Sequence, residues 1–303
     1  MQNAVILYYK YVALPDPQGE RDAQRALCEL LGLKGRVLIA SEGINGTLSG
    51  TSNAVDAYIA AMDAHPHFAG IEYKRDASAE VPFPKLKVKV RPEIVTLGAE
   101  IDPAGGATKL TPAEFHELIQ NPDVVLFDAR NDYESAIGKF RGAVTPGIKL
   151  FKDLPAALDE YEDLKDKTVV TYCTGGIRCE KASALMKSRG FKKLYQLEGG
   201  IIQYAKAYPE GAFEGECFVF DDRMSVAFND HPQALGACHF CAAGTNDYYN
   251  CQNPTCNDLI LVCVDCHEAG RTRCEACAAR PGHVNTDGAA SILPASNSAP
   301  SCI

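Results

Sequence analysis

The first feature of this sequence with a clear chemical meaning is a cysteine that directly follows a strand-like segment. Thr168–Tyr172 is rich in β-branched residues, and Cys173 comes immediately after it, before a glycine-containing loop. Open α/β sheets hold their sites at the carboxyl ends of parallel strands. Backbone N–H groups of such a loop, and the start of the helix behind it, favour a thiolate over a thiol. We therefore predict that Cys173 is a reactive centre.

The loop after Cys173 predicts how a sulfur anion is held. Its backbone amides face the sulfur, and Arg178 adds a fixed positive charge. The small ring suits a terminal sulfur better than a tetrahedral phosphate. The candidate catalytic residues are Cys173, Thr174, Gly175, Gly176, Ile177 and Arg178. An inert core cysteine is the alternative. Cys179 is either a resolving thiol for Cys173 or a packed helix residue.

Eight of the 13 cysteines form a second candidate site near the C-terminus. They fall into four pairs, and each pair can present two thiolates to one metal ion. The pairs are Cys238 with Cys241, Cys251 with Cys256, Cys263 with Cys266, and Cys274 with Cys277. We predict two structural zinc ions in Cys₄ sites, with an iron–sulfur site or metal-free thiols as alternatives. The four pairs combine into two sites in three ways, among which the spacing does not choose.

Composition and charge limit the possible functions. The 303 residues are 46% hydrophobic and 23% charged, which is typical of a soluble globular protein with two or three domains. No apolar run approaches the roughly 20 residues that cross a membrane, and the start lacks a signal-peptide pattern. We therefore expect a cytoplasmic protein whose cysteines bind metal or act in catalysis. The net charge of −9 opposes a globally basic nucleic-acid binder but leaves local patches open.

The elements expected around Cys173 alternate between strands and helices. Thr111 and Glu114 form a capping box that starts a helix with Phe115, Leu118 and Ile119 inward. The further expected elements are a strand at 124–127, a helix at 154–164, a strand at 168–172, a helix at 178–189, a strand at 194–197 and a final helix. This order predicts a parallel sheet covered by helices on both faces.

Residues 1–95 show a different alternation, βαββαβ, which predicts a ferredoxin-like or acylphosphatase-like module. The expected elements are a strand at 4–14, a helix at 21–33 that buries Leu27, Leu30 and Leu31, strands at 36–42 and 47–49 around a turn at 43–46, a helix capped by Ser52, and a strand at 71–76. The predicted fold class is thus a multidomain α/β and α+β protein. The predicted domains are 1–95, 96–215, a Cys-rich zinc-binding region at 216–283, and a disordered tail at 284–303.

Lysines alternate with apolar residues around Leu86–Val90. Lys85, Lys87, Lys89 and Arg91 therefore share one strand face. Such a face is either an edge protected against aggregation or a stripe that contacts nucleic-acid phosphates. A second candidate for phosphate contacts is the group Lys187, Arg189, Lys192 and Lys193.

Several motifs resemble known families. The Cys173 loop, Asp128-Ala129-Arg130 with Glu134, and Leu197–Ile201 resemble a rhodanese domain, in which the loop cysteine carries a persulfide. With Ser41–Thr47, Lys87–Val95 and Gly215–Arg223 added, residues 1–280 resemble the oxygen-dependent tRNA uridine 5-hydroxylases. This resemblance implies an acylphosphatase-like module before a rhodanese domain, and 5-hydroxylation of the wobble uridine in tRNA with molecular oxygen as co-substrate.

Missing motifs shape the remaining expectations. No histidine begins a His-x-Asp or His-x-Glu sequence, and no Gly-x-Gly-x-x-Gly follows a strand. The first absence means that the usual local part of an iron-binding facial triad is missing. The second leaves a flavin or nicotinamide site without support, so we expect none. The electron donor is not identified. The expected partner is tRNA, rather than DNA or a membrane. Two alternatives stay open: a persulfide-carrying sulfurtransferase that does not act on RNA, and a zinc-bearing RNA-binding or regulatory module with a vestigial loop.

Overall fold

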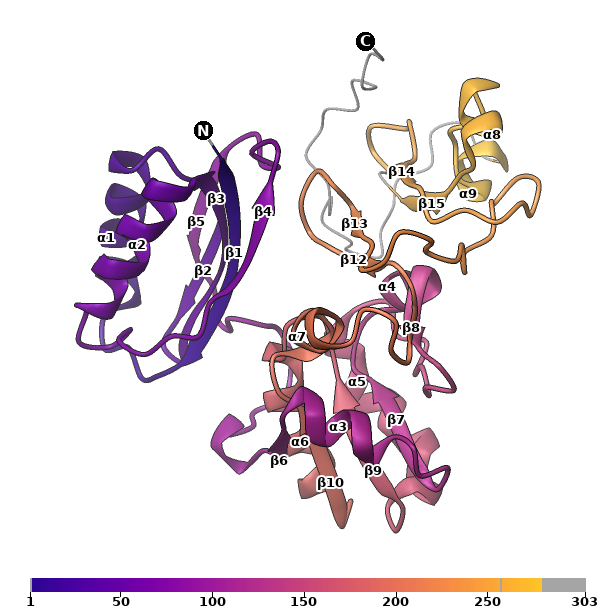
Figure 1. Ribbon diagram of the computed structural model, residues 1–303, viewed down its shortest axis with the longest axis horizontal. Coiled ribbons are helices and arrows are strands. Elements are labelled where there is room, and N and C mark those ends of the chain that lie inside the picture. Colours follow the sequence, from indigo (N-terminus) through magenta and orange to yellow (C-terminus); the bar gives the residue numbers. More distant parts are fainter. Residues whose placement is uncertain (1, 257, 280–303) are drawn as a thin grey trace.

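Three modules make up the part of the chain that the computed structural model describes, residues 2–256 and 258–279 (Figure 1). An N-terminal sheet with two helices lies beside a central α/β module, and a third part with short elements follows. No helix within the described residues is long and apolar enough to cross a bilayer. The tail predicted at 284–303 lies outside the described residues.

The N-terminal module is a five-stranded sheet in the order β4-β1-β3-β2-β5, with two helices on one face. Its elements are β1 Asn3–Tyr11, α1 Pro17–Leu30, β2 Lys34–Ala40, β3 Gly43–Thr51, α2 Ser52–Asp63, β4 Lys74–Ser78 and β5 Leu86–Val90. The first six confirm the predicted βαββαβ order. Alternate residues such as Ile6 and Tyr8 pack under the helices, so Leu7 and Tyr9 must project from the opposite face.

Two local predictions for α1 were wrong. Leu30 is 83% exposed, because the face of α1 against the sheet is made by Gln24, Cys28 and the partly buried Leu27, and Leu30 lies off that face. The helix also begins earlier than expected, at Pro17. Its N-cap is Asp16, whose side chain accepts a hydrogen bond from the backbone N–H of Gly19.

The N-cap of α2 is Thr51 rather than Ser52. The Thr51 hydroxyl accepts the backbone N–H of Ala54 at 3.3 Å. The helix itself buries Val55, Tyr58 and Met62.

The turn predicted at 43–46 was also wrong, because these residues belong to β3. Gly43 pairs with Ala40 on one side and Tyr11 on the other. A Cβ at Gly43 would lie 2.0 Å from the carbonyl oxygen of Lys10, and the residue has a φ of +143°. The glycine therefore allows close approach of β1 rather than a reversal of the chain.

The central module is a parallel four-stranded sheet in the order β6-β10-β9-β7, with helices on both faces, as predicted. Its strands are β6 Thr108–Leu110, β7 Val124–Asp128, β9 Thr168–Tyr172 and β10 Lys193–Leu197. Its helices are α3 Pro112–Leu118, α4 Asp132–Ile137, α5 Leu154–Ala157, α6 Ile177–Ser188 and α7 Gly200–Ala207, with short 3₁₀ helices at Pro103–Gly105, Phe151–Asp153 and Leu158–Leu164. The sequence missed β6 because it is short and mostly exposed.

The third part contains short elements around a small core. These are β12 Cys217–Phe218, β13 Ser225–Val226, β14 Tyr248–Asn250, β15 Leu259–Leu261, α8 Val264–Glu268 and α9 Glu275–Ala279; β11 Phe213–Gly215 pairs with β8 Gly138–Phe140 before them. Buried cysteines supply most of the core around β14 and β15. A core with so little apolar surface does not stabilise a small module by itself, and small modules of this kind commonly depend on bound metal ions for their stability.

Candidate active site

Cys173 lies in the turn between β9 and α6 and is 0% exposed. The backbone N–H of Gly176 donates to its sulfur at 3.1 Å. Gly176 adopts a φ of +100°, a left-handed conformation that glycine reaches without strain and that turns the chain back toward the sulfur. The strand–cysteine–helix order predicted from the sequence is the order found in the structure.

The environment of Cys173 favours its thiolate. Burial raises the pKa of this thiol, but the neighbouring Cys179 thiol, the Arg178 charge and backbone N–H groups together lower the pKa to about 6. Burial also raises the pKa of Cys28 and Cys217 to about 12. No neighbour lowers the pKa of Cys28, and the charges of Arg130 and Arg178 do not offset the burial of Cys217. Cys173 is therefore suited to act as a nucleophile at neutral pH.

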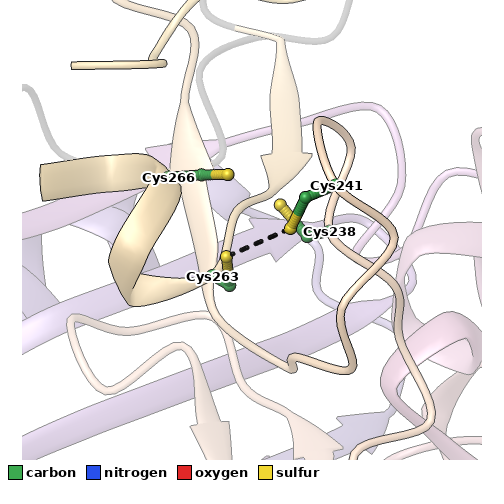
Figure 2. A group of neighbouring side chains, drawn as sticks. All are labelled: Cys238, Cys241, Cys263 and Cys266. Carbon is green, nitrogen blue, oxygen red and sulfur yellow. Dashed lines mark hydrogen bonds between the residues drawn. The ribbon is translucent and has the colours of Figure 1, made fainter. Parts of the chain in front are cut away.

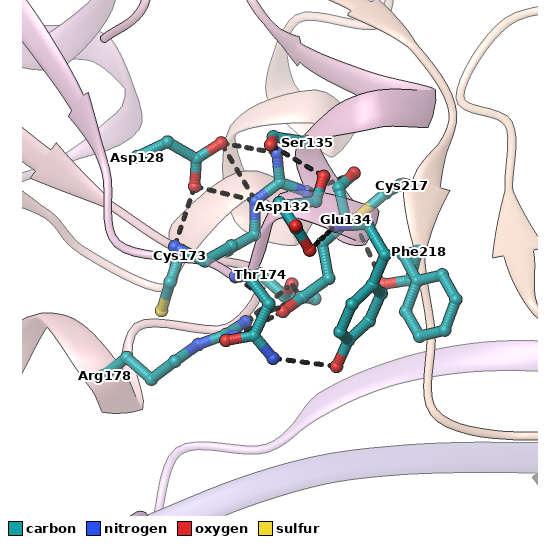
Figure 3. Close-up of polar contacts among 12 residues, drawn as sticks. Asp128, Asp132, Glu134, Ser135, Cys173, Thr174, Arg178, Cys217 and Phe218 are labelled. Carbon is teal, nitrogen blue, oxygen red and sulfur yellow. Dashed lines mark hydrogen bonds and ion pairs between the residues drawn. The ribbon is translucent and has the colours of Figure 1, made fainter. Parts of the chain in front are cut away.

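Arg178 contributes its charge to Cys173, but its hydrogen bonds go elsewhere. The guanidinium forms a bidentate ion pair with Glu134, with one Nη2–Oε2 distance of 2.7 Å (Figure 3). Thr174 donates its hydroxyl to the same carboxylate at 3.2 Å. Burial raises the pKa of Glu134, yet the charge and hydrogen bonds of Arg178 bring the pKa below its ordinary value. The pair thus fixes the base of the Cys173 loop to α4.

A second buried ion pair supports the first. Arg130 binds the carboxylate of Asp128 at 2.7 Å, and both side chains are 0% exposed. The same guanidinium donates to the carbonyl of Gly138 at 2.7 Å. The strand end at Asp128 is therefore tied to the helix that carries Glu134. The Asp-Ala-Arg motif and Glu134 serve as scaffold beneath the loop.

The N-terminal sheet covers the Cys173 loop with its open face. A Cβ on Gly175 would lie 2.6 Å from Cδ2 of Leu7, and one on Gly176 would lie 2.9 Å from the hydroxyl of Tyr9. Tyr9 also donates to Glu180 on α6 at 3.0 Å. The two loop glycines therefore permit the approach of another module as well as tight curvature. This contact joins residues far apart in the chain, so local sequence patterns did not predict it.

An ionic clamp holds the two modules together. Lys181 on α6 is 2% exposed and binds Glu42 at 2.8 Å and Glu93 at 2.6 Å. Both carboxylates also accept backbone N–H groups near the linker between the modules, which fixes their positions. Two of the motifs in the family resemblance, around Glu42 and Glu93, thus serve the junction between modules.

A cavity of about 540 Å³ lies where the three modules meet. Cys173, Thr174 and Gly175 line it from the central module, and Cys217 and Phe220 line it from the third part. The open face of the N-terminal sheet supplies the rest, including Tyr9, Arg36, Asn45 and Lys74. A cavity of this volume fits a nucleotide-sized ligand. Residues from the N-terminal sheet were missed at the sequence level because their approach depends on how the modules pack.

The predicted basic stripe lies on β5, at an edge of the N-terminal sheet. Arg36 of β2 pairs in register with Lys87 and faces the cavity, and Arg91 also lines the cavity. Burial and the positive charges of Arg36, Lys85 and Lys89 lower the pKa of Lys87. The stripe is therefore a concentration of like charge that continues to the cavity.

The second basic group is largely neutralised by its neighbours. Arg189 pairs with Asp159, and Lys192 pairs with Asp166 at 2.6 Å. Lys187 donates to the carbonyl of Gly106 at 3.0 Å. These contacts reduce the positive potential that the group offers to an RNA phosphate.

The eight paired cysteines form two clusters. Cys238, Cys241, Cys263 and Cys266 make one (Figure 2), and Cys251, Cys256, Cys274 and Cys277 make the other. Within each cluster the four sulfurs lie within 4.8 Å of one another. The pairs are thus interleaved: the first joins the third, and the second joins the fourth. The structure resolves a choice that spacing left open.

The geometry of both clusters fits a tetrahedral metal ion. Zinc–sulfur bonds of about 2.3 Å require sulfur–sulfur distances of about 3.8 Å. The Sγ atoms of Cys241 and Cys263 are 3.6 Å apart, and so are the Sγ atoms of Cys256 and Cys274. Four thiolates leave no open position, so each cluster is suited to a structural ion rather than to catalysis.

Comparison with known proteins covers nearly the whole chain. Residues 3–94 match the UPF0176 acylphosphatase like domain, 111–207 the Rhodanese-like domain and 214–278 the Rhodanase C-terminal domain. The tRNA uridine(34) hydroxylase of Arthrobacter sp. (strain FB24) is 44% identical over 294 residues, which cover 91% of this chain and 99% of the relative. The protein of the same name from Corynebacterium glutamicum is 42% identical over 294 residues, 91% of this chain and 94% of that one.

Proposed function

The chain belongs to the tRNA uridine(34) hydroxylase family, and we propose on this basis that it converts the wobble uridine of tRNA to 5-hydroxyuridine in the cytoplasm. The observation that carries the proposal is similarity to these relatives along their whole length, with the reactive-cysteine cavity inside the matched region. The reaction replaces the C5–H bond of uracil by C5–OH, a two-electron oxidation. Molecular oxygen supplies the new oxygen atom, and two electrons and two protons from a donor convert the other atom to water.

The cavity supports this activity in three respects. Cys173 supplies a nucleophilic thiolate, held by the backbone N–H groups of Gly176, Arg178 and Cys179 and by the charge of Arg178. Arg36 and Lys74 bring positive charge to the walls, and Tyr9 supplies an aromatic surface. A nucleotide base that is flipped out of its stack is typically bound in such a pocket, where aromatic side chains stack on it and polar groups hydrogen-bond to it.

Nucleoside mass spectrometry of tRNA tests the proposal directly. Deleting the gene should remove 5-hydroxyuridine and its derivatives from position 34, and restoring the gene should return them. Unchanged nucleosides would contradict the proposed activity. A persulfide on Cys173 formed from thiosulfate, together with unchanged tRNA, would favour the sulfurtransferase alternative, for which the small loop with its Gly176 amide is the supporting observation.

We also propose that both cysteine clusters hold zinc. Elemental analysis of the purified protein should then find about two zinc ions per chain. Replacing Cys238 and Cys263 by serine disrupts one cluster and should leave about one zinc ion. The matched double variant of Cys238 and Cys251 disrupts both clusters and should leave none. Equal zinc loss in the two double variants would contradict the interleaved pairing.

The β5 stripe is the proposed phosphate-contacting surface, because its lysines lead along the sheet edge to the cavity. Lys87→Glu with Lys89→Glu should weaken tRNA binding and reduce the slope of log affinity against log salt by about 2, close to one unit per lost contact. Binding measured at several salt concentrations checks this.

The matched control is Lys192→Glu with Lys193→Glu, which makes the same charge change where Asp166 already neutralises Lys192. We expect this variant to bind tRNA nearly as the unchanged protein does. Equal losses in both double variants would mean that net charge, rather than the stripe, determines affinity.

A further inference from the structure

Two buried lysines of this protein differ in their partners. Lys181 is 2% exposed and lies between the carboxylates of Glu42 and Glu93. Lys74 is 5% exposed, yet none of the ion pairs formed among the described residues includes it. A buried ammonium without a carboxylate is costly, so such groups are retained mainly where they serve a ligand or a reaction. Lys74 therefore needs an explanation that Lys181 does not.

Lys74 reaches the Cys173 loop from the opposite module. It begins β4, and its Cδ lies 4.0 Å from the position of a Cβ on Gly175. Its Nζ lies 5.2 Å from the centre of the Tyr9 ring, which provides a weak partner for the charge. Lys74 and Cys173 line the same cavity. Glu72 and Glu180 act on Lys74 only at longer range. A nucleophilic sulfur and an ammonium that has no direct ion pair thus share one ligand-sized space.

Uracil has a reactivity that this combination fits. Its C5=C6 double bond is conjugated with the C4 carbonyl, so a thiolate that adds at C6 pushes the π electrons through C5 onto O4. The resulting enolate is electron-rich at C5, the atom that hydroxylation must oxidise. A hydrogen-bond donor beside O4 stabilises this charge as it develops, and such donors contribute much of the catalysis in comparable reactions.

Resting on the proposed function, we propose that the Cys173 thiolate adds to C6 of the target uracil and that the Lys74 ammonium donates to O4. The sulfur lone pair forms the S–C6 bond, and the C5=C6 pair moves to leave negative charge on O4. The reverse path restores the base: the charge returns from O4, the C5=C6 double bond re-forms, and the thiolate departs, with no net gain or loss of a proton. The addition uses no oxidant. The cysteine thus activates the base, and the oxidant then reacts with a C5 atom that the addition has made electron-rich.

This reversible addition has a measurable consequence without oxygen. If the enolate takes a proton from solvent at C5 and then loses the original one, the C5 hydrogen exchanges. Incubating tRNA with the full-length protein in deuterium oxide under anaerobic conditions should therefore add one mass unit to uridine 34. Cys173→Ser should show no exchange. Lys74→Met should slow exchange about 10²-fold at saturating tRNA, because it removes a donor that acts in the transition state.

Two further variants make the result specific to Lys74. Lys74→Arg keeps a donor and should restore part of the exchange, which would not happen if the position were merely structural. Lys109→Met removes a nearby lysine that is already paired with Glu180 at 2.7 Å, and it should exchange like the unchanged protein. Far-ultraviolet circular dichroism identifies any variant that fails to fold.

The possible outcomes separate this inference from the proposed function. Aerobic hydroxylation without anaerobic exchange would overturn the adduct and leave the hydroxylase standing. Exchange at uridine 34 without any aerobic hydroxylation would support the adduct and overturn the hydroxylase. A folded Lys74→Met protein that exchanges at the unchanged rate would overturn the role of Lys74.

Discussion

Replacing Cys173 by serine should lower tRNA hydroxylation about 10³-fold or more, because the reaction loses its nucleophile. The change is nearly isosteric, and the site is fully buried between scaffolds that do not depend on the sulfur. A serine hydroxyl stays protonated at neutral pH, whereas the pKa of Cys173 is about 6. Alkylation of Cys173 should accordingly be fast above this pH and slow as pH falls through it, since the thiolate is the reactive form. Hydroxylation of purified tRNA and the pH profile of alkylation check the two parts.

The matched control is Cys28→Ala, which removes another fully buried thiol, one that lies in the core of the N-terminal module and does not line the cavity. We expect it to cost some stability and to keep hydroxylation. Substantial activity in the Cys173→Ser protein would remove the central residue of the proposed site.

The second large effect concerns stability. Glu134→Gln should lower the free energy of unfolding of the central module by about 3–5 kcal/mol, because it leaves the Arg178 guanidinium buried beside a neutral amide. The side chains of this pair are 0% and 8% exposed, so water cannot replace the lost charge. Urea denaturation of the full chain measures the change.

The control for this prediction is Glu214→Gln, which breaks the exposed ion pair between Arg141 and Glu214 and should cost about 1 kcal/mol or less. The buried pair also predicts a pH dependence. The folded-state pKa of Glu134 is lowered, so its contribution is complete above the unfolded value of about 4.3 and is lost as pH falls through the lower folded value. Equal destabilisation by the two glutamine variants would contradict the assignment.

The sequence predicted most of the central module because its signals are local. The capping box at Thr111, the strand ending at Tyr172 and the glycine that stops α6 each act within a few residues. The cysteine pairs were equally local, and their spacing predicted ligands without predicting partners. In contrast, Leu30 was misplaced, since apolar character alone does not say which side of a helix meets the sheet.

The part of the site that the sequence did not predict comes from contacts between modules. Arg178 was expected to stabilise the sulfur anion. Its guanidinium is instead hydrogen-bonded to Glu134, and Arg178 acts on the sulfur through its charge and its backbone N–H. Lys74 and Tyr9 carry no local mark of function, because an exposed sheet face and a cavity wall have the same alternating pattern. Their importance follows from the glycines at 175 and 176, which let the sheet approach.

During synthesis, Cys238, Cys241, Cys251 and Cys256 leave the ribosome before either native cluster can be completed, because each cluster needs cysteines from a later pair. Those four thiolates suffice in number for one tetrahedral ion, so a non-native arrangement is available to the nascent chain. The native partition then requires ligand exchange once residues 263–277 have emerged. With zinc bound as proposed, the final pairing of the cysteines would be determined by the energetics of the finished polypeptide rather than by the order in which the cysteines appear.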